Sequence, residues 1–129
     1  MALSILVVDD SVTVRSVIAK TLEMARIPVA KLHQAADGQE ALDLLDREWI
    51  DLVFADIHMP RMTGIEMVEK MAGNKMLESI PVVIVSSDGS SDRIEHLKSQ
   101  GVRGYIRKPF TPEQMREVVR DLMGVQADE

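Results

Sequence analysis

A short apolar run that ends in a carboxylate constrains the fold of this chain most strongly. Residues 52–55, Leu-Val-Phe-Ala, are followed at once by Asp56 and then by a Met-Pro turn at residues 59–60. Four consecutive apolar residues, one β-branched and one aromatic, are typical of a strand buried on both faces inside a parallel sheet. In open α/β sheets, ligands bind at the carboxyl ends of the strands. We therefore expect Asp56 to lie where such a strand emerges, at a candidate functional site.

Four further segments have the composition of strands, and their polarity indicates their order in a sheet. The segments at residues 4–8 and 81–85 are strongly apolar, whereas those at residues 29–35 and 102–107 are more polar and suit the edges of a sheet. Five strands that alternate with five helices predict an α/β fold, with a doubly wound parallel sheet and right-handed crossovers. We expect the flavodoxin-like strand order 2-1-3-4-5, whose switch point lies between the first and third strands.

The segments between the strands are predicted to be amphipathic helices, because apolar residues recur there at spacings of three and four. Capping-box patterns mark three of the helix starts, at residues 37–40, 63–66 and 111–114. The helix after residue 90 has only Ile94 and Leu97 to bury. We therefore expect this helix to be the loosest element of the fold.

Composition excludes several classes of function. A formal net charge of -6 argues against nucleic acid as a partner, because phosphate binding needs a basic face. One tryptophan, one tyrosine and two phenylalanines are too few to form a platform for stacked bases. The chain has no cysteine, which excludes disulfides and thiolate metal sites. Since no apolar run approaches membrane-spanning length, we expect a cytoplasmic protein of one domain that does not insert into membranes.

Carboxylates gather at the predicted switch point. Asp9 and Asp10 follow the first strand, and Asp56 follows the third. Three adjacent carboxylates raise one another's pKa unless a cation lies among them, and their oxygens suit a hard ion such as Mg²⁺. Ser86 and Lys108, at the ends of the fourth and fifth strands, would supply a hydrogen-bond donor and a positive charge to a phosphoryl group on Asp56. In the alternative interpretation, Asp9 and Asp10 cap a helix and Asp56 is a turn residue.

Four motifs at these strand ends occur together in one known family. They are Val-Asp-Asp-Ser at residues 8–11, Asp-Ile-His-Met-Pro-Arg-Met-Thr-Gly at residues 56–64, Pro-Val-Val-Ile-Val-Ser at residues 81–86 and Tyr-Ile-Arg-Lys-Pro-Phe at residues 105–110. In these motifs the chain resembles the receiver domain of two-component response regulators, and more closely the stand-alone, CheY-like chemotaxis type. The resemblance covers almost the whole chain. It implies a receiver domain at residues 1–124 and a short C-terminal tail at residues 125–129.

The resemblance also implies a role for each residue at the strand ends. The family more often has threonine where this chain has Ser86, and asparagine is common at His58, but neither difference removes a required group. The implied roles are phosphoacceptor for Asp56, Mg²⁺ ligands for Asp9, Asp10, Asp56 and the backbone carbonyl of His58, switch hydroxyl for Ser86, switch aromatic for Tyr105 and phosphate contact for Lys108.

The function implied by the resemblance is a phosphorylation-dependent signalling switch. The chain would accept a phosphoryl group from a sensor histidine kinase or a phosphotransfer domain. It would then signal by altered binding of a protein target, through a face made by the fourth helix, the fifth strand and the fifth helix. It would not be an enzyme beyond assisting its own phosphorylation and dephosphorylation, and we expect it to be a monomer when unphosphorylated.

Two alternative functions fit parts of the sequence. One is a receiver fragment of a longer response regulator, although we expect the final helix to end near Met123, which leaves too few residues for another module. The other is an aspartyl-nucleophile phosphohydrolase of the haloacid-dehalogenase type. Such enzymes place a second acid two residues after the nucleophile, where this chain has His58 after Asp56 and Ser11 after Asp9.

Two expectations concern conformation at the site. The ring of His58 is expected to lean over the pocket and, together with Asp88, to control how water reaches a phosphoryl group. On phosphorylation, Ser86 is expected to move toward the phosphoryl oxygens and to vacate space that lets Tyr105 turn inward. The loop from Ser86 to residue 91 is rich in Ser, Asp and Gly, and its low predicted contact density suits a movable element.

Overall fold

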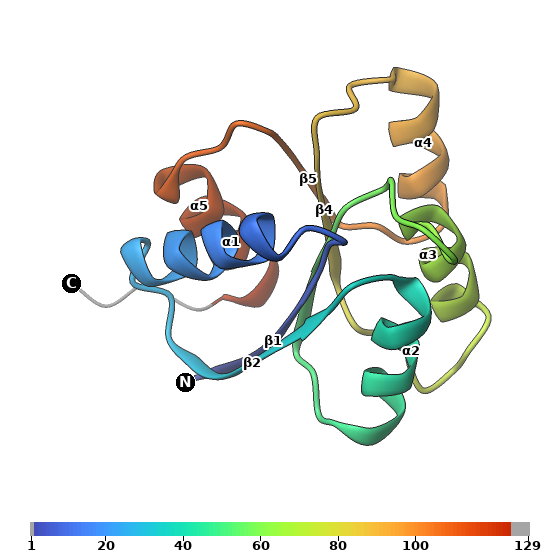
Figure 1. Cartoon of the computed structure of the whole chain (residues 1–129), viewed down its shortest axis with the longest axis horizontal. Coiled ribbons are helices and arrows are strands. Elements are labelled where there is room, and N and C mark those ends of the chain that lie inside the picture. The colour runs from blue at the N-terminus through green and yellow to red at the C-terminus, as the bar shows by residue number, and fades with distance from the viewer. Residues whose placement is uncertain (1, 125–129) are drawn as a thin grey trace.

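Five parallel strands form one sheet with helices on both faces (Figure 1). The computed structural model describes residues 2–124, so the predicted tail at residues 125–129 lies outside the described residues. Strands and helices alternate along the chain. The elements are β1 (Leu3–Val8), α1 (Val12–Met24), β2 (Val29–Ala35), α2 (Gly38–Arg47), β3 (Leu52–Ala55), α3 (Gly64–Ala72), β4 (Val82–Ser86), α4 (Ser91–Ser99), β5 (Gly104–Arg107) and α5 (Pro112–Met123).

The strand order is β2-β1-β3-β4-β5, which confirms the predicted order. The register is set so that strand ends align: Val8 pairs with Ala55, and Ala55 pairs with Ile84. Between β4 and the edge strand β5, Ser86 pairs with Arg107. Because all the strands are parallel, the residues that follow β1, β3, β4 and β5 lie together at the carboxyl end of the sheet.

Alternate residues of the central strands pack on opposite faces of the sheet, which is why these strands are apolar throughout. On β3, Val53 and Ala55 belong to the core beneath α2, α3 and α4, whereas Leu52 and Phe54 belong to the core beneath α1 and α5. Figure 1 shows these two groups of helices on opposite sides of the sheet. The edge strand β2 is at least partly exposed at all but its last residue, which accounts for its more polar composition.

Side-chain caps determine where the helices begin. Ser11, and neither Asp9 nor Asp10, is the N-cap of α1, and its side chain accepts a hydrogen bond from the N–H of Val14 at 3.2 Å. The predicted capping boxes of α3 and α5 are both complete. The box predicted for α2 is only half formed, because the carboxylate of Glu40 accepts from the residue before the N-cap. Because Ser11 caps α1, Asp9 and Asp10 are not used as its N-cap and remain available to the site.

Helix α4 has the fewest buried residues. It buries Leu97 alone and leaves Ile94 partly exposed, whereas each of the other described helices buries at least two residues. This confirms that α4 has few apolar anchors. Among residues 2–124, no helix combines the length and the apolar character needed to cross a membrane.

Candidate functional site

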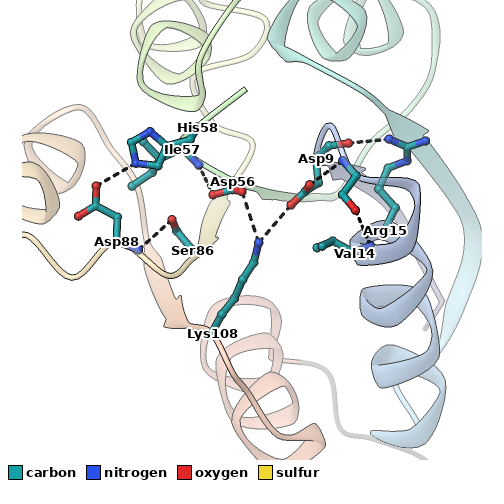
Figure 2. Close-up of polar contacts among 10 residues, drawn as sticks. Asp9, Val14, Arg15, Asp56, Ile57, His58, Ser86, Asp88 and Lys108 are labelled. Carbon is teal, nitrogen blue, oxygen red and sulfur yellow. Dashed lines mark hydrogen bonds and ion pairs between the residues drawn. The ribbon is translucent and has the colours of Figure 1, made fainter. Parts of the chain in front are cut away.

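The carboxyl ends of β1, β3 and β5 bring two acids and one base together (Figure 2). The ammonium nitrogen Nζ of Lys108 lies 3.3 Å from Oδ2 of Asp9 and 3.3 Å from Oδ2 of Asp56. Both distances exceed the roughly 2.7–2.9 Å of a strong charge-assisted hydrogen bond. The peptide bond between Lys108 and Pro109 is cis. One lysine is thus shared between two carboxylates, and its single positive charge balances only one of their two negative charges.

Asp9 is the more enclosed of these two acids, with 2% of its surface exposed. Its Oδ1 accepts a hydrogen bond from the N–H of Ser11 at 2.9 Å, and its backbone carbonyl accepts one from Arg15 at 2.6 Å. Burial raises the pKa of the Asp9 carboxyl above its ordinary value, the Ser11 amide and Lys108 oppose this rise, and the Asp56 carboxylate adds to it. The net rise therefore comes mainly from burial of the Asp9 carboxyl, with a smaller contribution from the neighbouring Asp56 carboxylate.

The three carboxylates predicted to bind a metal differ in their burial. Asp10 is exposed, whereas Asp9 is buried and Asp56 is partly buried. Within residues 2–124, no group of three or more acidic, histidine or cysteine side chains is arranged to hold a metal ion. Asp9 and Asp56 provide a pair of carboxylates beside Lys108. Because Mg²⁺ typically takes one or two carboxylates and keeps several waters, this pair fits such an ion.

The turn after Asp56 passes very close to the strand end. Oδ1 of Asp56 accepts the N–H of Ile57 at 2.7 Å, and the carbonyl of Ile57 accepts the N–H of Gly64 at 2.9 Å. A Cβ atom added at Gly64 would overlap the backbone carbonyl oxygen of Asp56. Glycine at this position therefore allows α3 to begin against the backbone of the candidate phosphoacceptor.

An ion pair between the buried Asp37 and the largely exposed Arg61 holds the same turn. The carboxylate of Asp37 is fully buried and accepts a hydrogen bond from Nε of Arg61 at 2.6 Å, and a second guanidinium nitrogen also contacts it. Burial alone would raise the pKa of Asp37, but the Glu40 amide and the Arg61 guanidinium lower it below its usual value. The sequence pattern indicates Asp37 only as a helix cap. Its pairing with Arg61, which has a left-handed backbone with φ of 62°, becomes evident only in the fold.

Ser86 lies at the end of β4 and Tyr105 lies on β5, the two strands that follow β3 in the sheet. Ser86 is buried at the end of β4, and its Oγ accepts the N–H of Asp88 at 3.2 Å, so its own proton is available to another acceptor. The hydroxyl of Tyr105 is buried and has no hydrogen-bond partner in the described part of the chain. Burial and the charge of Asp88 raise the pKa of Tyr105, and the nearby Ser86 partly offsets this without reaching hydrogen-bonding geometry. The hydroxyl of Tyr105 is therefore covered in this structure, and the inward turn of its ring on phosphorylation stays a prediction.

The ring of His58 is tied to the loop between β4 and α4. Its Nε2 lies 3.0 Å from Oδ2 of Asp88, and the same oxygen pairs with Arg93 of α4 (Figure 2 shows the histidine contact). Oδ1 of Asp88 accepts the N–H of Ser90 at 2.9 Å. The Ser90 amide, His58 and Arg93 lower the pKa of Asp88 to about 2. Both carboxylate oxygens of Asp88 thus already accept hydrogen bonds, and no sequence motif indicated the part taken by Arg93.

The fold and the site define a class of protein. An acid-rich edge of a parallel sheet in the order 2-1-3-4-5, with a lysine shared between the acids of β1 and β3, is the arrangement that the strand-end motifs predict. Residues 5–120 match the family model described as the response regulator receiver domain. The chain therefore belongs to the response regulator receiver domain family, which confirms the resemblance inferred from the motifs.

Similar proteins place the chain more narrowly, among CheY-like receivers. It is 36% identical over 128 residues to the chemotaxis protein CheY homolog of Campylobacter jejuni, across 98% of this chain and 97% of that protein. The solved structure of the chemotaxis response regulator CheY4 of Vibrio cholerae is 28% identical and superposes with a TM-score of 0.83, across 95% of this chain and 100% of that one. The receiver domain of a sensor histidine kinase from Pseudomonas aeruginosa, solved with a magnesium ion coordinated in its active site cleft, shares the fold at 19% identity and a TM-score of 0.83, across 97% and 100% of the two chains.

Proposed function

We propose that this chain is the phosphorylation-dependent switch of a two-component system of the chemotaxis type, with Asp56 as its phosphoacceptor. The observation that carries this proposal is the position of Lys108, 3.3 Å from both Asp9 and Asp56 at the carboxyl edge of the sheet. Asp56 is partly exposed, so a phosphoryl donor can reach it. The adjacent ammonium would stabilise the oxygens of the transferred group. The receiver domain would comprise residues 1–124.

The proposed reaction moves one phosphoryl group between two proteins. A carboxylate oxygen of Asp56 attacks the phosphorus of a phosphohistidine on a sensor histidine kinase or a phosphotransfer domain. The new P–O bond forms as the P–N bond breaks, and the donor imidazole keeps the electron pair. Lys108 stabilises the charge on the phosphoryl oxygens, and the Ser86 hydroxyl donates a hydrogen bond to one of them. The acyl phosphate then acts as a signal, so the chain is not an enzyme beyond assisting its own phosphorylation and dephosphorylation.

Mg²⁺ is the proposed cofactor of this transfer. Its proposed ligands are Asp9 and Asp56, with Asp10 and the backbone carbonyl of His58 completing the set. The excess negative charge of two carboxylates beside the single Lys108 supports this assignment. When bound, such an ion supplies positive charge that offsets the charge on carboxylate and phosphoryl oxygens. The receiver domain from Pseudomonas aeruginosa, which has the same fold, was solved with a magnesium ion in its own active site cleft.

The proposed output surface is the face of α4, β5 and α5. A groove of about 420 Å³ lies on this face, and Ile94, Tyr105 and Val118 are among the side chains that line it. Helix α4 has a single buried anchor, Leu97, so it can shift at a low cost in packing. We propose that phosphorylation changes how a protein target binds here, and that the unphosphorylated chain is a monomer.

Phosphotransfer from a panel of purified histidine kinases tests this function. The wild-type chain should take up labelled phosphoryl, Asp56→Asn should not, and EDTA should abolish labelling. Asp121→Asn, which alters an exposed acid on α5, is the matched control and should be labelled like the wild type. Labelling of Asp56→Asn at the wild-type rate would place the acceptor elsewhere, and labelling that resists EDTA would contradict the metal assignment.

A further inference from the structure

An apolar groove lies at the end of the sheet opposite Asp56. Its volume is about 480 Å³, and it is lined by the end of α2 and its connection to β3, the connection from α3 to β4 and the end of α5. Both connections lead into the amino ends of strands, so the length of β3 separates the groove from the phosphoacceptor (Figure 1 shows the path of the chain). The floor of the groove includes the buried side chains of Leu45, Ile50 and Leu77.

Two large apolar side chains that line this groove are mostly exposed. Trp49 is 79% exposed and Met76 is 83% exposed, and both line the groove. The indole Nε1 of Trp49 donates to Oδ1 of Asp51 at 2.8 Å, and Oδ2 of Asp51 accepts the N–H of Ser4 at 2.8 Å. The ring is thus held to β1 through one carboxylate. Tryptophan and methionine are enriched in protein interfaces, and a ring already held in place loses little freedom on binding.

The rim of the groove is acidic. Asp46, Glu48 and Asp51 line it, and none of the described residues that line it is a lysine or an arginine. An apolar floor with an acidic rim complements a segment whose apolar side chains are flanked by Lys or Arg. A second copy of this chain, placed on the groove by two-fold symmetry, would bring its own acidic rim against this one. The charge therefore favours a basic partner over a second copy.

We propose that this groove is a docking site for a partner protein that presents an amphipathic segment with basic residues beside its apolar side chains. No residue of the groove takes part in the proposed phosphorylation, so docking does not depend on it. A partner bound here would leave uncovered both Asp56 and the other groove, which Ile94, Tyr105 and Val118 line. The chain would then be held at this groove while Asp56 is phosphorylated and while the face of α4, β5 and α5 binds its target.

The single tryptophan of the chain is a local reporter for this site. Two synthetic peptides without tryptophan serve as probes, one an amphipathic helix of Leu and Lys and the other the same helix with Glu at each Lys position. Each is titrated into the full chain while the fluorescence emission of Trp49 and the NMR signal of its indole N–H are followed. The Lys peptide should shift the emission to shorter wavelength and move the indole signal. The Glu peptide should do neither.

Matched variants separate this groove from general attraction to an acidic protein. Met76→Ala should weaken binding of the Lys peptide about fivefold or more, whereas Met24→Ala, at a methionine of α1 that is 59% exposed, should not change it. Glu48→Gln should weaken binding by up to about fivefold. Glu95→Gln, at an exposed acid of α4, should leave binding unchanged.

Three results would overturn the proposal. The first is equal binding of the Glu peptide, and the second is a Lys peptide that binds without changing the Trp49 signals or that does not bind at all. The third is a change in the Trp49 signals with protein concentration alone that Met76→Ala removes. That third result would identify a second copy of the chain as the occupant.

Discussion

Removal of the Ser86 hydroxyl should weaken the proposed switch without preventing phosphorylation of Asp56. Ser86→Ala leaves Lys108 beside Asp56, where the two groups are 3.3 Å apart, so the acceptor and its positive charge are unchanged. The variant removes the hydrogen bond that we expect the buried hydroxyl to donate to the phosphoryl group. It also removes the bond from the N–H of Asp88 to Ser86, which at 3.2 Å is near the long limit for such bonds.

The magnitude follows from these two losses. A hydrogen bond to a charged phosphoryl oxygen contributes about 1.5–3 kcal/mol, and the long neutral bond in the inactive form contributes about 0.5 kcal/mol. The net loss for the active form is then about 1–2.5 kcal/mol, or roughly fivefold to seventyfold in the ratio of active to inactive protein. If phosphorylation moves the wild type from about 1:99 to about 99:1, the Ser86→Ala protein would be about 95% to about 60% active.

NMR on the beryllofluoride-bound protein measures this population through the backbone amides of α4. The α4 amides of Ser86→Ala should lie between their free and their wild-type bound positions, while labelling by a kinase reaches the wild-type level. Ser87→Ala, at the exposed neighbouring hydroxyl, is the control and should behave as the wild type. Because the Tyr105 hydroxyl is already buried, the α4 amides rather than a flip of that ring are the decisive signal. Full wild-type shifts in Ser86→Ala would mean that the signal reaches α4 by another route.

Three shorter predictions concern the turns around the site. Gly64→Ala should lower the free energy of unfolding by at least about 2–3 kcal/mol, measured in urea, because its Cβ would overlap the backbone oxygen at the end of β3. Arg61→Ala should cost about 1–3 kcal/mol, a range kept low because Arg61 is 66% exposed. The folded-state pKa of Asp37 lies below its unfolded value. The stability that the Asp37 carboxylate contributes is therefore complete above about pH 4 and is lost as the pH falls through the folded pKa. An acid-unfolding midpoint that Arg61→Ala leaves unchanged would contradict this pairing. His58→Ala should speed loss of the phosphoryl group, because it removes one of the groups that hold the Asp88 carboxylate. An unchanged rate of dephosphorylation in the double variant with Asp88→Ala would exclude both residues from control of this rate.

The local pattern of the sequence determined the architecture. Strands buried on both faces need apolar residues at every position, whereas edge strands tolerate polar ones, so β1, β3 and β4 could be placed centrally and β2 and β5 at the edges. The same reasoning located the site, because parallel strands bring their carboxyl ends to one edge. Asp9, Asp56, Ser86 and Lys108 meet there as predicted, and their chemical roles remain predictions.

Only the tertiary structure decided which side chains became partners. Asp9 and Asp10 are adjacent in sequence, yet one is buried against Lys108 and the other is exposed. The pairing of Asp88 with Arg93, and the groove at Trp49, depend on the paths of loops. Strand and helix patterns are set by neighbours a few residues apart, so the sequence displays them. Contacts across the sheet depend on register, turn geometry and side-chain reach together, and those are settled only when the whole chain packs.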